Sequence, residues 1–258
     1  MKPHKLTFQV CLKVGKLRSK PFLLPKLTFQ VCLCLFFFLL SAEISSAKGP
    51  TGGRLAIVVD ERLAALRQTP QLTGALIRRL SRGRLVAIRA SKTTPDGVVF
   101  FLVNVTTRTH GWIQREALAS PNRPGDDRRL LDLINASHGF DRIARARIFL
   151  DYFTRSPLRA EVLLLLSTAA EEQAAKLSSD AAKRLNLTTT NAPDFTYFLN
   201  YQALDRYNRQ RVKFVFDKAA KRFHYDGAAL RELVRRYPKT PEAATARIHL
   251  EQLNAISQ

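Results

Sequence analysis

The stretch VVFFLVNVTTRTHGWI, residues 98–113, decides the architecture of the first half of the chain. Its first eight residues, rich in Val and Phe, form the longest β-type run of the sequence. Phe101, Val103 and Val105 share one face by the two-residue period of a strand, so we expect them to fill a core. A second β-type segment, His110-Gly111-Trp112-Ile113, follows after a polar turn.

Shorter β-type runs precede this stretch, at Leu55–Val59, Ala75–Ile77 and Leu85–Ile88. Turn signals separate them, the strongest being Ser81-Arg82-Gly83 and Thr94-Pro95-Asp96-Gly97. Short strands dense in Val, Ile and Phe predict a small β-barrel over residues 54–120.

Several residues of this segment resemble the bacterial SH3-like (SH3b) domains. Ala65-Leu66-Arg67 before Thr69-Pro70 is similar to their "N-V-R-x-G-P" start, and Gly83 stands at their "K-G" turn. Phe100–Val103 resembles their "W-Y-x-V" strand and Gly111-Trp112-Ile113 their "G-W-V", at the family's spacing. The chain departs from the pattern where Phe100 replaces a tryptophan and Ala65 an asparagine.

The resemblance covers roughly a quarter of the chain and implies a barrel that binds cell-wall peptide or an envelope protein. The ligand-binding residues would then be Arg67, Phe100 and Trp112. Trp112, the only tryptophan, would offer a flat stacking face; in the alternative, which we favour, it fills the barrel, because buried aromatics dominate small cores.

The N-terminal segment has the three-part pattern of an export signal. Ten apolar residues, VCLCLFFFLL at 31–40, are too few for a membrane span of about 20 residues. Lys16–Lys26 supplies basic residues before the run, and Ser45-Ser46-Ala47 follows it with small ones. We therefore predict a signal peptide over residues 1–47 and an exported, periplasmic or extracellular protein. The alternative is an uncleaved anchor or a buried helix. All three cysteines lie in this segment.

Beyond the loop Pro121–Gly125 the apolar spacing becomes helical, which predicts an α-helical domain over residues 126–258. The complete prediction is thus a two-domain chain, all-β followed by all-α. A Ser-Pro pair at 156–157 is expected to start the longest helix. Thr188–Asp194 is expected to form a loop between helices. The expected helices are 141–154, 157–185, 195–204, 212–223, 228–236 and 241–255.

Two segments of the helical half have similar sequences. Phe149 to Ala160 and Leu233 to Ala244 both place an aromatic at a helix end and a Ser/Thr-Pro pair before the next helix. The second copy resembles the helix junction of tetratricopeptide-like repeats in bacterial envelope proteins, "Y-P-x-S-P-E-A". No 34-residue period occurs, so we expect helical hairpins rather than a regular array.

The chain is strongly basic, with 42 Lys and Arg against 21 Asp and Glu in 258 residues, a formal charge of +21. This charge suggests an anionic partner. The densest basic segment, expected to be helical, could bind an anionic envelope polymer; in the alternative it is a solubilising face. Export argues against nucleic acid. The patch comprises Arg206, Arg209, Arg211, Lys213, Lys218, Lys221 and Arg222.

No catalytic or metal-binding motif occurs after residue 47: HExxH, GxSxG, a glycine-rich phosphate loop and CxxC are all missing. The four histidines there are dispersed. Glu171 and Glu172 are adjacent and would diverge by about 100° on a helix, so they do not form a catalytic pair. We expect a non-enzymatic binding or scaffold protein with no catalytic residue, cofactor or metal. An accessory subunit of an envelope enzyme is the third possibility.

Overall fold

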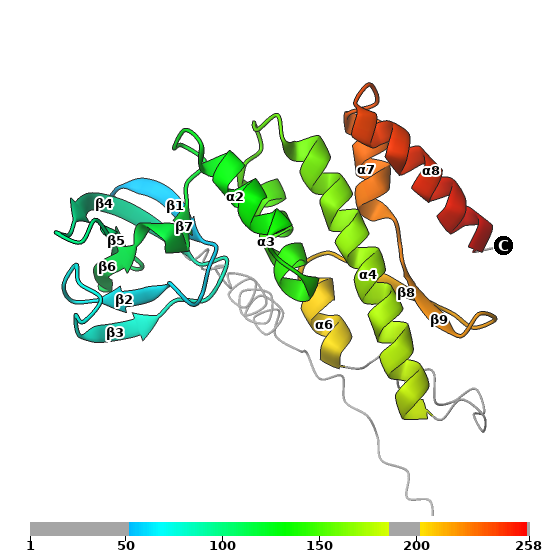
Figure 1. The fold of residues 1–258 in the computed structure, drawn as a ribbon, viewed down its shortest axis with the longest axis horizontal. Helices are drawn as coiled ribbons and strands as arrows, with labels where there is room; N and C mark the ends of the chain where they lie inside the picture. Colours follow the sequence, from blue (N-terminus) through cyan, green and yellow to red (C-terminus); the bar gives the residue numbers. More distant parts are fainter. Residues whose placement is uncertain (1–51, 186–201, 257–258) are drawn as a thin grey trace, which may run out of the picture. The chain divides into compact units, whose positions relative to one another are not determined.

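The computed structural model describes residues 52–185 and 202–256, which belong to one compact unit. The predicted signal peptide, residues 1–47, lies outside the described residues. An antiparallel sheet comes first in the chain, and helices follow it (Figure 1). None of the described helices is long and apolar enough to cross a membrane.

Seven strands form the sheet, in the order β3-β2-β6-β5-β4-β1-β7, with every neighbouring pair antiparallel. The 3-10 turn η1, Arg115–Ala117, precedes the last strand. The strands are β1 (Arg54–Val58), β2 (Ala65–Arg67), β3 (Leu76–Arg79), β4 (Leu85–Thr93), β5 (Val99–Asn104), β6 (His110–Gln114) and β7 (Leu118–Ala119).

The period-two prediction for the longest β-type run is confirmed. Phe101, Val103 and Val105 are buried in one cluster, with Leu66 and Ile113 among its other members. The sheet begins and ends close to the predicted limits, and its short last strand was not predicted. Since β7 pairs with β1, the two chain ends of the sheet lie side by side.

Helices make up most of the second half of the chain. Figure 1 shows α3, α4, α7 and α8 following one another side by side, and α3–α4, α4–α7 and α7–α8 are in contact. The helices are α2 (Asp126–Asn135), α3 (Gly139–Tyr152), α4 (Arg159–Leu185), α6 (Gln202–Arg209), α7 (Ala228–Arg236) and α8 (Pro241–Ile256).

The helix predicted over 212–223 is wrong. Residues 214–217 form β8 (Phe214–Asp217), which pairs with β9 (Arg222–Tyr225) in a two-stranded hairpin. Aromatic side chains alternate along both strands, and Phe216 faces Phe223 with ring centroids 5.0 Å apart. This alternation has the period of a strand. The predicted all-α half therefore contains a β-hairpin, and most of the helix predicted over 195–204 falls outside the described residues.

The two similar segments also share a pattern of backbone hydrogen bonds. The amide of Phe153 donates to the carbonyl of Phe149, and the amide of Tyr237 donates to that of Leu233. In both copies the next Ser or Thr donates its amide to the carbonyl of the aromatic residue. The following helix starts at Pro241 in the second copy but at Arg159 in the first, two residues later than predicted.

Candidate binding site

The three predicted ligand-binding residues lie on one face of the sheet. Arg67 pairs with Trp112 across β2 and β6, and Trp112 pairs with Leu102 across β6 and β5. Phe100 is two residues from Leu102 on the same strand, so it points to the same side. The buried cluster of Phe101 and its neighbours occupies the opposite side. We call the side of Arg67, Phe100, Leu102 and Trp112 the outer face.

Trp112 does not fill the core, which corrects the interpretation we favoured. Its side chain is half-buried, whereas its neighbours Gly111 and Ile113 are buried on the core side. The reason is register: Ile113 occupies the inward position of β6, and Trp112 is therefore outward. Part of Trp112 is exposed at the outer face.

Phe100 lies at the base of an open pocket of about 920 Å³. The side chain itself is buried, 1% exposed. One wall is the turn of residues 69–73 between β2 and β3, and the other, residues 92–96, is the end of β4 with the turn that follows it. Leu72, on the first wall, is half exposed at 50%. An aromatic base between two walls of mixed polar and apolar residues suits an extended ligand that presents one apolar group.

Arg67 positions one wall of this pocket. Its Nη1 donates a 2.7 Å hydrogen bond to the carbonyl oxygen of Gly74, which closes the turn of residues 69–73. A side chain added at Gly74 would lie 2.4 Å from Oγ1 of Thr69, so the turn is tightly folded. Arg67 is half-buried. It holds the turn through this hydrogen bond and also lies beside Trp112.

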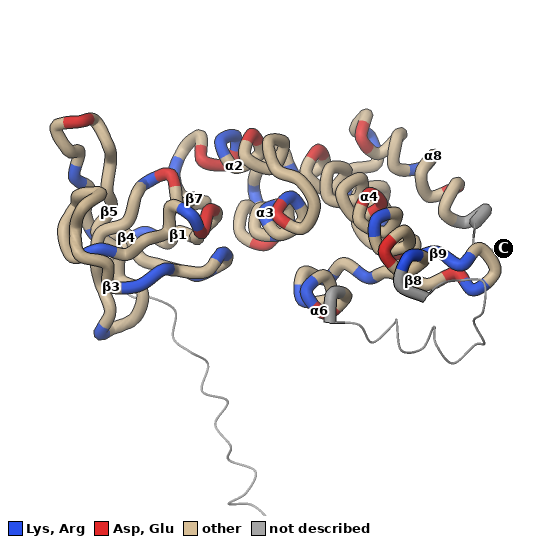
Figure 2. The backbone as a smooth tube through the Cα atoms, turned by 60° about the horizontal axis from the view of Figure 1, so that its bottom comes forward, with Lys and Arg blue, Asp and Glu red and all other residues tan. Residues whose placement is uncertain are grey.

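The predicted basic patch does not lie on helices throughout. Arg206 and Arg209 are on α6, Arg211 and Lys213 follow it, and the others surround the turn of the β8–β9 hairpin. Figure 2 shows positive residues on α6 and on this hairpin. All seven side chains are exposed. They are Arg206, Arg209, Arg211, Lys213, Lys218, Lys221 and Arg222.

Two members of this patch already have partners. The guanidinium of Arg206 lies 5.0 Å from the ring centre of Phe140 and 4.7 Å from that of Tyr207. Arg211 forms an ion pair with Asp151 at 3.0 Å. These contacts join α6 and the turn after it to α3, so part of the positive charge serves packing.

Sequence reasoning missed a buried ion pair between the sheet and the helices. Arg145 of α3 donates to the carbonyl oxygen of Val59, and its Nη2 lies 3.3 Å from Oδ2 of Asp60. Both charged side chains are under 10% exposed, at 4% and 8%. Arg145 falls within an amphipathic helix, where arginine is expected at the surface, so spacing gave no sign of its partner.

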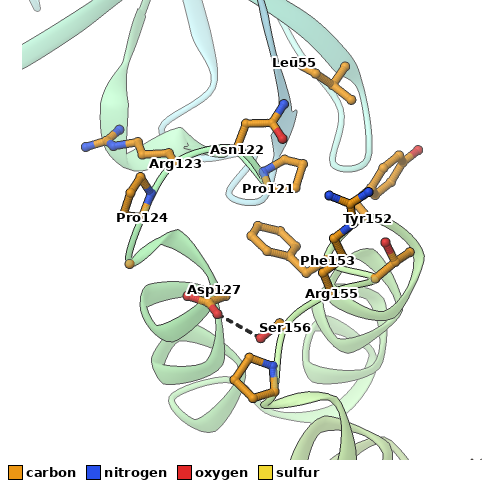
Figure 3. Close-up of a pocket in the computed structure, with 13 residues that line it drawn as sticks. Leu55, Pro121, Asn122, Arg123, Pro124, Asp127, Tyr152, Phe153, Arg155 and Ser156 are labelled. Atoms are coloured by element: carbon orange, nitrogen blue, oxygen red, sulfur yellow. Dashed lines mark hydrogen bonds between the residues drawn. The ribbon is translucent and has the colours of Figure 1, made fainter.

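Asp126 forms a second polar link, where the loop of residues 121–125 meets α2. It accepts a 2.8 Å hydrogen bond from the amide of Ser120, whose hydroxyl donates to the carbonyl oxygen of Leu55. Beside this link lies a pocket of about 640 Å³, bordered by Pro121, Phe153 and Leu55 (Figure 3). Its floor includes a hydrogen bond from Ser156 to Asp127.

The two adjacent glutamates of α4 lie in different surroundings. Glu172 is exposed and lies 3.7 Å from Arg142, whereas burial raises the pKa of Glu171 and one of its oxygens has no hydrogen-bond partner within the described chain. The two carboxylates therefore face different surroundings, as their adjacent positions predict. Among the described residues no three His, Cys, Asp or Glu side chains gather as a metal site.

We found no match to this chain among family models, curated proteins or solved structures. The outer face and its pocket must therefore be judged on their own geometry.

Proposed function

We propose that this chain is an exported, non-enzymatic binding protein whose sheet binds an extended peptide of the cell wall or of an envelope protein. The observation that carries the proposal is the outer face, where Trp112 and Arg67 pair directly and Phe100 forms the base of a 920 Å³ pocket. A stacking ring, a cation and an apolar base together suit a peptide that carries a carboxylate and a small apolar side chain.

An SH3-like barrel is the proposed form of the sheet. Support comes from the antiparallel strand order and from the position of Gly111-Trp112-Ile113 on β6 beside β2. The hydrogen bonds repeated at Phe153 and Tyr237 support the interpretation of the helices as a tetratricopeptide-like domain. In this proposal the helices form a scaffold for the binding sheet.

The proposed export is supported by the sequence of residues 1–47. The basic residues, the ten-residue apolar run and Ser45-Ser46-Ala47 support it. This location gives the sheet access to wall peptides and envelope proteins.

A second candidate function is binding of an anionic envelope polymer. It is favoured by the exposure of all seven patch residues defined above. Against it, Arg206 and Arg211 are engaged with α3 or its neighbours. The remaining charge is concentrated at the hairpin turn around Lys218 and Lys221.

Binding to purified peptidoglycan in low and high salt separates the two candidates. Trp112→Ala and Arg67→Ala test the outer face, and Lys218→Gln combined with Lys221→Gln tests the hairpin turn. Ile248→Ala on α8 is the matched apolar control, because its side chain is 57% exposed and far along the chain from the sheet. Far-UV circular dichroism of each variant establishes that it is folded.

We expect salt-resistant binding that Trp112→Ala weakens at least tenfold and Ile248→Ala leaves unchanged. Binding that disappears in high salt and falls with the lysine pair would transfer the function to the hairpin, because exposed charges are screened within about 10 Å at 0.1 M salt. No binding under either condition overturns the wall-peptide proposal.

A further inference from the structure

A second, smaller pocket lies at the end of the sheet near the loop to α2. Its volume is about 240 Å³. Three arginines border it: Arg54 at the start of β1, Arg115 at the start of η1, and Arg123 in the loop. The other lining residues are Ile88, Ser91, Val99, Phe101 and Ser120.

Positive charge is in excess around this pocket. Arg129 is a fourth guanidinium near it, and burial together with the charges of Arg115, Arg129 and Arg54 lowers the pKa of Arg123. Asp126 opposes this shift. Its carboxylate is shared, 3.8 Å from Arg123 and 3.4 Å from Arg129, and it also accepts the amide of Ser120. One buried carboxylate therefore faces several cations.

Arg123 packs over an aromatic ring at the edge of the pocket. Its guanidinium lies 5.4 Å from the ring centre of Phe101, and its side chain extends away from Phe153 (Figure 3). Stacking occupies the face of a guanidinium but leaves its N–H donors directed outward in the plane. Such a fork matches the oxygens of a phosphate or carboxylate.

We propose that this pocket binds a phosphate group, either as the free ion or as the terminal phosphate of a larger molecule. Three bordering arginines favour a divalent anion over a single carboxylate, because each guanidinium supplies one positive charge and several donors. The 240 Å³ volume lies below the range of about 300–1,000 Å³ for drug-sized ligands, so only the anionic end of a larger molecule would be enclosed. This site does not depend on the function proposed for the outer face.

Calorimetric titration of the full chain tests the proposal, with sodium phosphate and glycerol 3-phosphate as the two probes and sodium chloride at equal ionic strength as the blank. The test variants are Arg123→Gln and Arg115→Gln. Arg108→Gln removes the same charge from an exposed position in the β5–β6 turn and is the matched control. Thermal melts identify any variant that fails to fold, and Arg115→Gln remains informative if Arg123→Gln disturbs the loop.

We expect saturable phosphate binding that Arg123→Gln and Arg115→Gln each weaken at least tenfold and Arg108→Gln changes less than twofold. Equal binding of both probes indicates that a terminal phosphate suffices, and binding of phosphate alone indicates the free ion. Equal weakening by all three variants would mean unspecific charge attraction and overturn the proposal. Absence of saturable binding to the wild-type chain would overturn it as well.

Discussion

Gly111 occupies a place in β6 where no side chain fits. A Cβ there would lie 2.8 Å from the carbonyl oxygen of Arg67 and 2.9 Å from carbon atoms of Ile77 and Leu66. Gly111→Ala should therefore lower the free energy of unfolding by about 1–3 kcal/mol, the usual cost of forcing extra atoms into a packed site. Urea denaturation measures it. His110→Ala, at the exposed neighbouring residue, should change stability by less than about 0.5 kcal/mol, and equal effects of the two variants would contradict this account.

The buried pair of Arg145 and Asp60 should be costly to break. Arg145→Met leaves the carboxylate of Asp60 buried with only Arg62 beside it, and removal of one buried partner costs about 3–5 kcal/mol. Arg128→Met, at an exposed position on α2, is the control and should be nearly neutral. Denaturation curves that shift equally for both variants would rule out a structural role for the pair.

The same pair predicts a pH dependence of stability. Burial acts to raise the pKa of Asp60, but the hydrogen bonds and charge of Arg62 and the charge of Arg145 outweigh it and lower the pKa. A carboxyl with a lowered pKa stabilises the fold above its unfolded pKa of about 3.9, and this contribution is lost as pH falls through the folded value.

We therefore expect the stability difference between the wild-type chain and Asp60→Asn to be largest at neutral pH and to shrink below about pH 4. Urea denaturation at several pH values measures this difference. A difference that stays constant down to pH 2 would show that the charge of Asp60 is not what stabilises the joint.

At the level of single residues, the sequence predicted the inward side of the longest strand but not the orientation of Trp112. Phe101, Val103 and Val105 were correctly placed in the core because strand period alone determines which side they share. Trp112 was assigned inward, since its size suggested a core role, but register placed Ile113 there instead. The pairing of Arg145 with Asp60 depends on contacts between segments far apart in the chain, which no local pattern encodes.

Among the elements, the β8–β9 hairpin depends on Asp217. Its Oδ1 accepts hydrogen bonds of 2.8 Å and 3.0 Å from the amides of Ala219 and Ala220 in the turn. Asp217→Ala should remove both and speed amide hydrogen exchange in the hairpin by about fivefold or more, because each such bond contributes about 0.5–1.5 kcal/mol. Exchange in α3 should be unaffected, and uniform acceleration in both elements would mean that the substitution acts on the whole fold.

This hairpin also shows where helix prediction failed. Aromatic residues and lysines in 212–223 are compatible with either period over so short a run. The alternation of Phe214 and Phe216, repeated by Phe223 and Tyr225, was the signal that favours strands. The helices 228–236 and 241–255 were predicted almost to the residue, because a long apolar stripe and the Thr-Pro start define them.

Across the whole molecule, one buried cluster joins the sheet to the helices, and the sheet also has a separate buried cluster around Phe101, Val103 and Ile113. Ile57 and Ala119 of the sheet, together with Val59 just after β1, belong to the same buried cluster as Phe149 and Leu166 of the helices. Unfolding should therefore be a single cooperative transition. Trp112 fluorescence reports on the sheet and far-UV circular dichroism mainly on the helices, so the two urea curves should superimpose. Two separated midpoints would show that the joining cluster does not couple the sheet to the helices.

The sequence predicted two domains from the change of period at Pro121–Gly125, but it gave no sign of the buried cluster that joins them. Apolar side chains of the two halves pack against each other in this cluster. The spacing of apolar residues predicts that each half has an apolar face, but it does not predict which faces meet. The candidate site was predicted in part: the three residues proposed from the family resemblance do share a face, whereas the pocket walls at 69–73 and 92–96 are formed by turns whose geometry only the fold supplies.

The position of β1 between β4 and β7 has a consequence for how the chain is made. A ribosome adds about 5–20 residues per second from the N-terminus, so β1 emerges well before either of its partners. The hairpin of β4 and β5 can form as soon as both are synthesised, but the other side of β1 stays unoccupied until Leu118 and Ala119 follow. A nascent chain halted before that point presents Ile57 and Val58 on an open strand edge. This unfinished state, rather than the completed sheet, is then the one most exposed to pairing with other chains.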